Sequence, residues 1–142
     1  MIRVYGTSIA LGGAGVLLRG PSGCGKSDLA LRLIDRGALL VADDQTELYR
    51  DGDDIRMTAP AVIAGQIEVR GLGILRAPYA AAAPLRLVVD LVAPADVDRM
   101  PEARVCELLG REVPLIALAP FEASVDAKLR LALRAVTPTA VM

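Results

Sequence analysis

The chain has 142 residues, the length of one ordinary domain, and we expect residues 1–142 to form a single domain. Apolar residues make up 54% of the sequence, which supplies a full core and excludes a disordered chain. The net charge of −1 argues against a general nucleic-acid or membrane-binding surface, and the absence of His excludes His-based triads, bases and metal sites.

The sequence also lacks the features of a secreted or membrane protein. No apolar run approaches the ~20 residues of a membrane span, and the first eleven residues lack a signal-peptide pattern. Two cysteines, Cys24 and Cys106, are too few for a disulfide framework or a zinc site. We therefore expect a cytoplasmic protein with no membrane or nucleic-acid partner.

The first predicted elements are a hairpin and a helix. Residues 2–11 and 14–19 read as two strands joined by a tight turn at Gly12-Gly13. A loop with three glycines and a proline follows. From residue 26 to 36 the apolar residues share one helical face, and Gly37 is a natural C-terminal stop.

The middle of the chain has the short runs of a β-rich region. Residues 38–42 are wholly apolar, which is typical of a strand buried on both faces. Alternation from 46 to 58 around Asp51-Gly52 predicts a second hairpin. Residues 67–74 are predicted as a strand fragment that runs into a loop with two glycines, and after an Ala/Pro-rich connection residues 85–92 form a buried strand.

Two strands and a helix are predicted for the C-terminal part. The strands cover residues 104–109 and 113–118, on either side of Gly110. Ser124 is a candidate N-cap for a helix whose apolar stripe runs from residue 125 to 136.

The loop between the second strand and the first helix fits the phosphate-binding pattern G-x-x-x-x-G-K-[ST] at every position. Its residues are Gly20, Pro21, Ser22, Gly23, Cys24, Gly25, Lys26 and Ser27. Glycines let backbone N–H groups turn inward around an anion, and the following helix presents its positive end to it. Lys26 can reach the β- and γ-phosphates, and Ser27 can offer a hydroxyl to Mg²⁺. A chance match is the alternative, but the strand before and the helix after favour a nucleoside triphosphate site.

Two segments compete to supply the acidic residues of this site. One is the end of the run Leu87-Val88-Val89-Asp90, and the other is Asp43-Asp44. Geometry favours the second, because a right-handed crossover through the helix would make the strand at 38–42 parallel to the strand before the loop. One carboxylate could then accept the proton of an attacking hydroxyl while the other holds water or metal. Adjacent strand residues point to opposite faces, so we expect only one to face the reaction directly.

Two more charged residues, Glu68 and Arg70, lie within the apolar segment IEVRGLGI. A strand that runs into a glycine-rich loop can bring a carboxylate and a guanidinium into a shared cleft. From spacing alone they could equally form an ion pair on a sheet face.

Three blocks, GPSGCGKS, LVADD and IEVRGLGI, together resemble the catalytic domain of bacterial HPr kinase/phosphorylase. The resemblance is close from about Tyr5 to Leu75 and looser afterwards, and IEVRGLGI is its most specific part. The chain resembles a short form without the N-terminal domain of longer members. The resemblance implies an α/β, P-loop-containing kinase domain with a central mixed β-sheet flanked by helices.

The resemblance further implies an ATP- and Mg²⁺-dependent kinase that phosphorylates a Ser on HPr, a phosphocarrier protein of the phosphotransferase system, or on a paralogue. Family members also reverse the reaction with inorganic phosphate and are typically hexamers, so a homo-oligomer is implied. Carried over by motif, Lys26 is catalytic and Asp44 is the proton acceptor, with Asp43 beside it. Ser27 and Glu68 match the metal ligands, and Arg70 lies in the signature segment as a further catalytic candidate.

The sequence departs from the family pattern at two places. Tyr5 stands where the family usually has an active-site His, and a phenol of pKa ~10 cannot carry protons at neutral pH in the same way. The segment from Leu75 to Pro84 is short, and Arg76 and Arg86 are the nearest candidates for the family's later catalytic Arg. These departures weaken the expectation of phosphorylase activity more than that of kinase activity. A regulatory nucleotide-binding module and a small-molecule kinase or NTPase are the alternatives.

Overall fold

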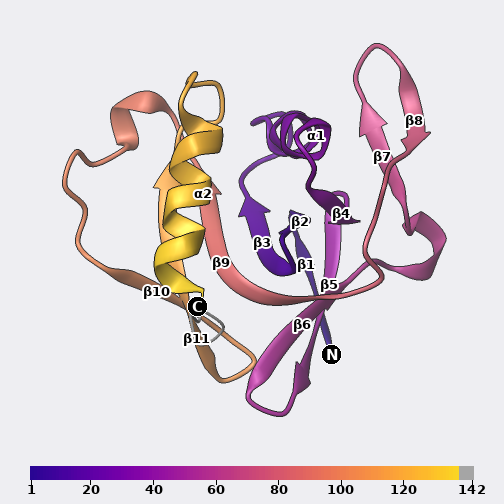
Figure 1. Cartoon of the computed structure of the whole chain (residues 1–142), viewed down its shortest axis with the longest axis horizontal. Coiled ribbons are helices and arrows are strands. Elements are labelled where there is room, and N and C mark those ends of the chain that lie inside the picture. The colour runs from indigo at the N-terminus through magenta and orange to yellow at the C-terminus, as the bar shows by residue number, and fades with distance from the viewer. Residues whose placement is uncertain (138–142) are drawn as a thin grey trace.

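The computed structural model describes residues 1–137, which form a curled mixed β-sheet and two α-helices (Figure 1). The strands are β1 (Ile2–Tyr5), β2 (Thr7–Leu11), β3 (Ala14–Arg19), β4 (Leu39–Ala42), β5 (Gln45–Asp51), β6 (Asp54–Thr58), β7 (Gln66–Val69), β8 (Gly73–Arg76), β9 (Ala83–Leu91), β10 (Arg104–Leu108) and β11 (Arg111–Leu118). The helices are α1 (Lys26–Asp35) and α2 (Val125–Val136), and short 3₁₀ turns lie at Ala61–Ile63 and Pro94–Asp96. The α/β class expected from the sequence is confirmed. Among the described residues we find no helix with the length and hydropathy needed to cross a bilayer.

The longest strand, β9, connects two layers of sheet. It runs parallel to β3 on one side and to β11 on the other, and its first residues pair antiparallel with β6. The strand order is β1-β5-β6-β9-β3-β2-β4, with β11 and then β10 continuing from β9. Because β2 is antiparallel to both β3 and β4, the last two run in the same direction, as the crossover argument predicts, but with β2 between them.

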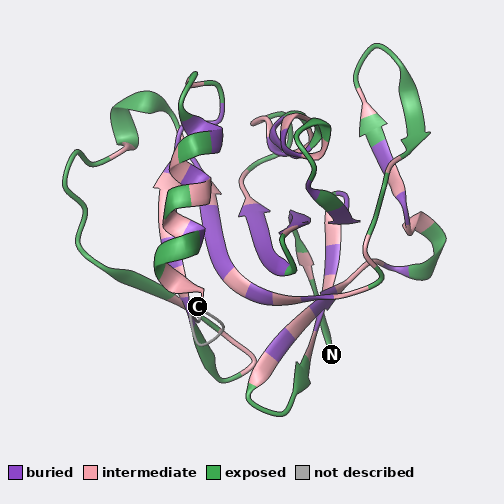
Figure 2. Ribbon diagram, in the orientation of Figure 1, coloured by how far each residue is buried: buried purple, intermediate pink, exposed green. Residues whose placement is uncertain are grey.

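The two faces of the central strands pack against different partners. Leu18 of β3 belongs to a core cluster with Leu29 of α1 and Leu129 of α2. The adjacent Leu17 belongs to a second cluster, with Met57 of β6. Both helices therefore cover one face of the sheet, and the β5–β6 hairpin folds over the other. This arrangement leaves β3 almost wholly buried (Figure 2).

The first hairpin and the first helix lie where the sequence predicts them. The strands β2 and β3 pair antiparallel across Gly12-Gly13, with Leu11 opposite Ala14. Helix α1 ends just before Gly37, whose φ of 104° is a left-handed conformation that favours glycine. The amide of Gly37 donates to the carbonyl of Ile34 at 3.0 Å, which satisfies one of the free carbonyls of the last turn.

The prediction of one strand over residues 2–11 is wrong, because the chain breaks at Gly6. The segment before it pairs with β5, whereas the segment after it pairs with β3 and β4. A Cβ on Gly6 would lie 2.8 Å from Cδ1 of Leu17 and 2.9 Å from the carbonyl oxygen of Leu18. Glycine thus permits the close approach at which the strand changes partners.

Residues 67–74 also differ from the prediction. The chain turns back after β7 and forms β8, so the segment is a two-stranded hairpin with Ile67 opposite Leu75. Gly71 and Gly73 adopt φ values of 93° and 96°, and these left-handed conformations allow the tight turn. The hairpin stands apart from the main sheet, beyond α1 (Figure 1).

The remaining predicted elements are confirmed with small changes of boundary. The pairs β5–β6 and β10–β11 are antiparallel hairpins, as predicted. Strand β9 begins at Ala83 because this residue pairs with Met57. Ser124 is the N-cap residue of α2, although its side chain makes no capping hydrogen bond.

Packing of α2 on the sheet can be tested with two leucines of the same helix. Leu129 is fully buried, whereas Leu131 is 60% exposed. We expect Leu129→Ala to lower the free energy of unfolding by about 2–5 kcal/mol, because it removes buried apolar contacts and leaves a cavity. The matched change Leu131→Ala should alter it by no more than about 0.5 kcal/mol. Urea unfolding measures both, and equal effects would contradict this packing of α2.

Candidate active site

The phosphate loop has the context that its motif requires. Strand β3 ends at Arg19, α1 begins at Lys26, and the intervening residues turn sharply between them. Gly23 and Gly25 adopt φ values of 82° and 109°, a left-handed conformation that a residue with a side chain adopts only under strain. The free N–H groups of the first turn of α1 therefore open toward the loop, as anion binding requires.

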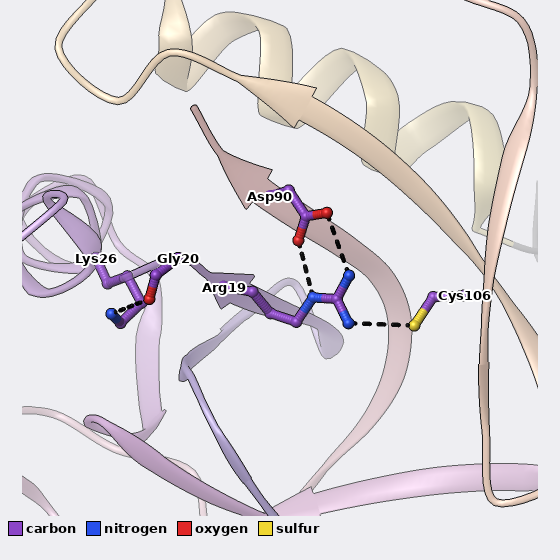
Figure 3. A network of polar contacts seen from close by, with 5 residues as sticks. All are labelled: Arg19, Gly20, Lys26, Asp90 and Cys106. Atoms are coloured by element: carbon purple, nitrogen blue, oxygen red, sulfur yellow. Dashed lines mark hydrogen bonds and ion pairs between the residues drawn. The ribbon is translucent and has the colours of Figure 1, made fainter. Parts of the chain in front are cut away.

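Lys26 is tied to the loop that precedes it. Its side chain is almost buried, and Nζ donates to the carbonyl oxygens of Gly20 at 2.6 Å and Pro21 at 3.1 Å (Figure 3 shows the first of these bonds). Buried charged groups in proteins need hydrogen-bond partners, and these two carbonyls are the partners of the ammonium. The loop thus holds a cation beside the N-terminus of α1, where both attract a polyphosphate.

A buried carboxylate, Asp43, connects three elements around this loop. Its Oδ1 accepts hydrogen bonds from the hydroxyls of Ser27 at 2.6 Å and Thr7 at 3.2 Å. Its Oδ2 accepts the backbone N–H of Glu68 at 2.9 Å. The carboxylate therefore fixes α1, β2 and β7 relative to one another, and it orients the hydroxyl of Ser27.

Asp44 follows immediately in a left-handed conformation with φ of 67°. Its N–H donates to the hydroxyl of Thr7 at 3.1 Å, and its carbonyl accepts the N–H of Gly6 at 2.8 Å. These bonds stabilise a conformation that is uncommon outside glycine but tolerated by Asp and Asn. Because the strand has already ended at Ala42, strict alternation does not apply, and both acidic residues line the same cleft. The two side chains differ in exposure, since Asp43 is buried and Asp44 is exposed.

A cleft of about 560 Å³ brings most of the predicted residues together. Its lining comprises Ser22, Gly23, Gly25, Lys26, Ser27, Asp28, Leu31, Asp43, Asp44, Glu68, Val69, Arg70 and Phe121. Glu68 and Arg70 reach it from β7 and the turn that follows, and no ion pair joins them within residues 1–137. The alternative of a structural pair on a sheet face is therefore wrong.

Three residues of the loop motif do not line the cleft. Gly20 and Pro21 supply the carbonyls that hold Lys26, and Cys24 packs beneath the loop. A Cβ on Gly20 would lie 2.5 Å from Sγ of Cys24 and 3.3 Å from the carbonyl oxygen of Leu91, so a larger residue there would require Cys24 to move.

The competing acidic residue, Asp90, has a different partner. It forms a two-point ion pair with Arg19 at 2.8 and 3.2 Å, and Arg19 also donates to Sγ of Cys106 at 3.4 Å (Figure 3). The hydrogen bonds to Asp90 raise the pKa of Arg19, against the opposing effect of partial burial, so the guanidinium stays charged. Asp90 does not line the cleft, in agreement with the preference for Asp43-Asp44.

The residues that depart from the family pattern also lie outside the lining. Tyr5 is the last residue of β1 and is 79% exposed. Arg86 pairs with Asp54 at 3.0 Å, and Arg76 is exposed on β8. Neither arginine contributes to the cleft, so no counterpart of the later catalytic Arg is found there within the described part of the chain.

Sequence reasoning missed four lining residues, one of which, Val69, lies between the predicted Glu68 and Arg70. Asp28 and Leu31 lie on the first turns of α1, and Phe121 lies in the loop between β11 and α2. The helical pattern could have indicated the first two, since they share the α1 face opposite the buried leucines. Nothing in the sequence near Phe121 predicts that its loop packs beside a phosphate loop about a hundred residues earlier.

The oxygen donors of the cleft fit a hard cation of the Mg²⁺ type. In residues 1–137 no group of three or more His, Cys, Asp or Glu forms a ready-made cage. Mg²⁺ is usually held by one or two protein oxygens together with substrate phosphates. The hydroxyl of Ser27, oriented by Asp43, and the exposed carboxylates of Asp44 and Glu68 supply that kind of site.

The Arg19–Asp90 pair gives a test of which carboxylate serves the site. We expect Asp90→Asn to lower the free energy of unfolding by about 1–3 kcal/mol, because a partly buried, charge-assisted pair is lost. Its affinity for a nucleoside triphosphate should stay within about twofold of the unchanged protein. Urea unfolding and equilibrium titration measure the two quantities. A large loss of nucleotide affinity in Asp90→Asn without a loss of stability would show that Asp90 belongs to the nucleotide site.

Comparisons with known proteins agree with this geometry. The family model described as HPr Serine kinase C-terminal domain matches residues 1–119. The chain is 48% identical over 75 residues to the HPr kinase/phosphorylase of Caldanaerobacter subterraneus subsp. tengcongensis and 49% identical over 75 residues to that of Alkaliphilus metalliredigens. These matches cover 52% of this chain but only 25% and 24% of the relatives, so it spans about a quarter of their length.

A solved structure extends the likeness over nearly the whole chain. The structure of the HPr(Ser) kinase/phosphatase from Coxiella burnetii superposes with a TM-score of 0.84 at 27% identity, and the match covers 95% of each chain. The strand order, the phosphate loop and the family match therefore lead to one conclusion. The chain belongs to the HPr Serine kinase C-terminal domain family.

Proposed function

We propose that this chain transfers the γ-phosphoryl group of ATP to a Ser of an HPr-like phosphocarrier protein. The observation that carries the proposal is the convergence of Lys26, Ser27, Asp43 and Asp44 in one cleft beside the N-terminus of α1. Membership of the family and the names of its relatives, HPr kinase/phosphorylase, support the choice of protein substrate. Residues 1–142 act in this proposal as one catalytic domain in the cytoplasm, where ATP and phosphocarriers meet.

The phosphate loop binds and orients the nucleotide. Its backbone N–H groups and the ammonium of Lys26 hold the β- and γ-phosphates. To reach them, the ammonium exchanges the carbonyls of Gly20 and Pro21 for phosphate oxygens. Mg²⁺, when bound, would be held by Ser27 and Glu68 with the phosphates, and would neutralise the charge that develops on them.

The acidic pair divides two tasks between neighbouring residues. Asp43 keeps the Ser27 hydroxyl in place by accepting a hydrogen bond from it. The oxygen lone pairs of that hydroxyl are then free for a metal ion. Asp44 is exposed in the cleft and accepts the proton of the acceptor Ser as its oxygen attacks the γ-phosphorus. The bond between that phosphorus and the bridging oxygen breaks, and ADP leaves with the electron pair. Arg70, across the cleft, stabilises the charge on the transferring group.

The reverse reaction uses the same carboxylate as a donor. In phosphorolysis, Asp44 returns the proton to the Ser oxygen while inorganic phosphate accepts the phosphoryl group. Tyr5, at the family's His position, lies outside the cleft lining, so this position supplies no proton carrier for the reverse reaction. Kinase activity is therefore the better supported of the two directions. By analogy with the family, the proposal also includes assembly of the chain into a homo-oligomer.

The role of Asp44 is tested by Asp44→Asn, which keeps a residue that tolerates the left-handed backbone. We expect phosphoryl transfer to fall by about 10²–10⁴-fold, because the proton acceptor is lost, while ATP still binds. Lys26→Ala should lose both transfer and most nucleotide affinity. The assay follows label from ATP with Mg²⁺ to a purified HPr-type carrier. The same carrier with its acceptor Ser changed to Ala is the control.

Transfer at a near-normal rate by Asp44→Asn would remove this residue from its assigned role. Label released to water or found only on a small metabolite would refute the protein substrate. ATP binding without transfer would favour a regulatory nucleotide-binding module.

The role of Asp43 is tested through the metal. We expect Asp43→Asn to weaken Mg²⁺-dependent ATP binding by about 10–100-fold, because the amide no longer fixes the Ser27 hydroxyl as a ligand. Binding of ATP measured in the presence of a chelator should change much less. The titrations are compared with those of Asp90→Asn, whose carboxylate lies near the end of β9 and pairs with Arg19. Equal losses with and without Mg²⁺ would show that Asp43 only supports the loop.

A further inference from the structure

The single Phe of the chain lies exposed at the edge of the candidate active site. Phe121 is 70% exposed, lies in the loop between β11 and α2, and lines the same cleft as Lys26 and Ser27. Nothing in the phosphoryl-transfer chemistry above uses it. An exposed aromatic ring at the edge of a polar cleft offers a π-face on which a planar ligand can stack.

The ring rests directly on the phosphate loop. A Cβ on Gly25 would lie 2.8 Å from Cζ of Phe121 and 3.3 Å from Cβ of Pro120. Gly25 is the residue that precedes α1, so the tip of the ring meets the loop at the point where its amides begin to open. The ring therefore lies against the phosphate loop itself.

Arg32 holds the ring from the side of α1. Its guanidinium lies 5.9 Å from the ring centroid, within the range of a cation–π contact. The same guanidinium pairs with Asp28 at 3.0 Å and donates to the carbonyl of Pro120. These contacts anchor the β11–α2 loop to α1 and limit the rotation of the ring.

The sheet places Phe121 and the carboxylates on opposite flanks of the loop. Asp44 follows β4, which is separated from β3 by β2, whereas Phe121 follows β11, which is separated from β3 by β9. The transferred phosphate of a bound triphosphate must face Asp44. Its nucleoside end then leaves the loop on the opposite flank, toward Phe121.

We propose that Phe121 is the residue on which the nucleobase stacks, and that Arg32 is the positioning residue that holds its ring. The inference rests on the proposed function only in taking a nucleoside triphosphate as the ligand. Stacking on an aromatic face favours any planar base. The base therefore adds affinity to that of the phosphates.

Equilibrium binding by the full 142-residue chain, with Mg²⁺, tests the proposal through a pair of ligands. We expect Phe121→Ala to weaken ATP binding about tenfold, and inorganic tripolyphosphate binding by less than about twofold. Phe121→Tyr should restore ATP binding, whereas Phe121→Leu, which keeps the apolar bulk without a π-face, should not. Equal losses for both ligands would mean that the ring only supports Gly25, and would overturn the proposal. Unchanged ATP binding, or ATP bound no more tightly than tripolyphosphate by the unsubstituted chain, would also overturn it.

A spectroscopic measurement gives a second, independent readout. Because the chain has no Trp, Phe121→Trp introduces a single tryptophan at the proposed contact, and its emission can be excited apart from that of the three tyrosines. We expect ATP to quench its emission and tripolyphosphate to leave it nearly unchanged. Tyr79→Trp is the matched control, since Tyr79 is also an exposed ring resting on a glycine, Gly65, but does not line the cleft. Equal quenching at both positions, or none at Phe121→Trp despite bound ATP, would contradict stacking.

The positioning role of Arg32 is tested by combination. Arg32→Gln should weaken ATP binding in the unsubstituted chain but cause no further loss in the Phe121→Ala background, because the two act as a unit. Additive losses would contradict that role.

These experiments need no protein substrate, so they separate the inference from the proposed function. If ATP stacks on Phe121 but no carrier is phosphorylated, the kinase proposal fails and the inference stands. If Phe121→Ala raises the KM for the carrier and leaves ATP binding unchanged, the ring binds the protein instead and the inference fails.

Discussion

The site depends on one buried carboxylate that is satisfied by three different elements. Asp43 accepts hydrogen bonds from Thr7 on β2, from Ser27 on α1 and from the backbone of Glu68 on β7. A buried carboxylate with fewer hydrogen bonds would cost folding free energy, so the three bonds together favour the arrangement of the three elements. The same carboxylate thereby sets where the phosphate loop, the second acidic residue and the β7–β8 hairpin stand relative to one another.

The local parts of this site were predictable from the sequence, because their signals lie within a few residues. The phosphate-loop motif, the helical periodicity after it and the apolar run before Asp43 each identify an element directly. Family resemblance adds Glu68, whose role spacing alone leaves open. The break at Gly6 was not predictable, because it arises from the pairing of two adjacent segments with different strands, β1 with β5 and β2 with β3.

The contacts that the sequence could not predict join residues far apart in the chain. In the sequence, Asp90 ends an apolar run as an ordinary metal-binding carboxylate does, but in the structure it lies within β9 and pairs with Arg19, 71 residues away. The left-handed backbone of Asp44 depends on Thr7 and Gly6, and it places two neighbouring acidic residues on one cleft. Phe121 reaches the phosphate loop because β11 lies next to β9 in the sheet.

The carboxylates follow β4, which is the terminal strand of its layer rather than a central one. Most open α/β sheets bind their ligands in a crevice between central strands, where a small substrate can be enclosed. Here Asp44, Glu68 and Arg70 are exposed at the rim, so a phosphate bound beside them would face outward. A metabolite bound there would share the site with solvent, and water could compete for the phosphoryl group. A folded protein that presents a Ser from its surface would itself cover the cleft. Water would then be excluded only while the correct acceptor is bound.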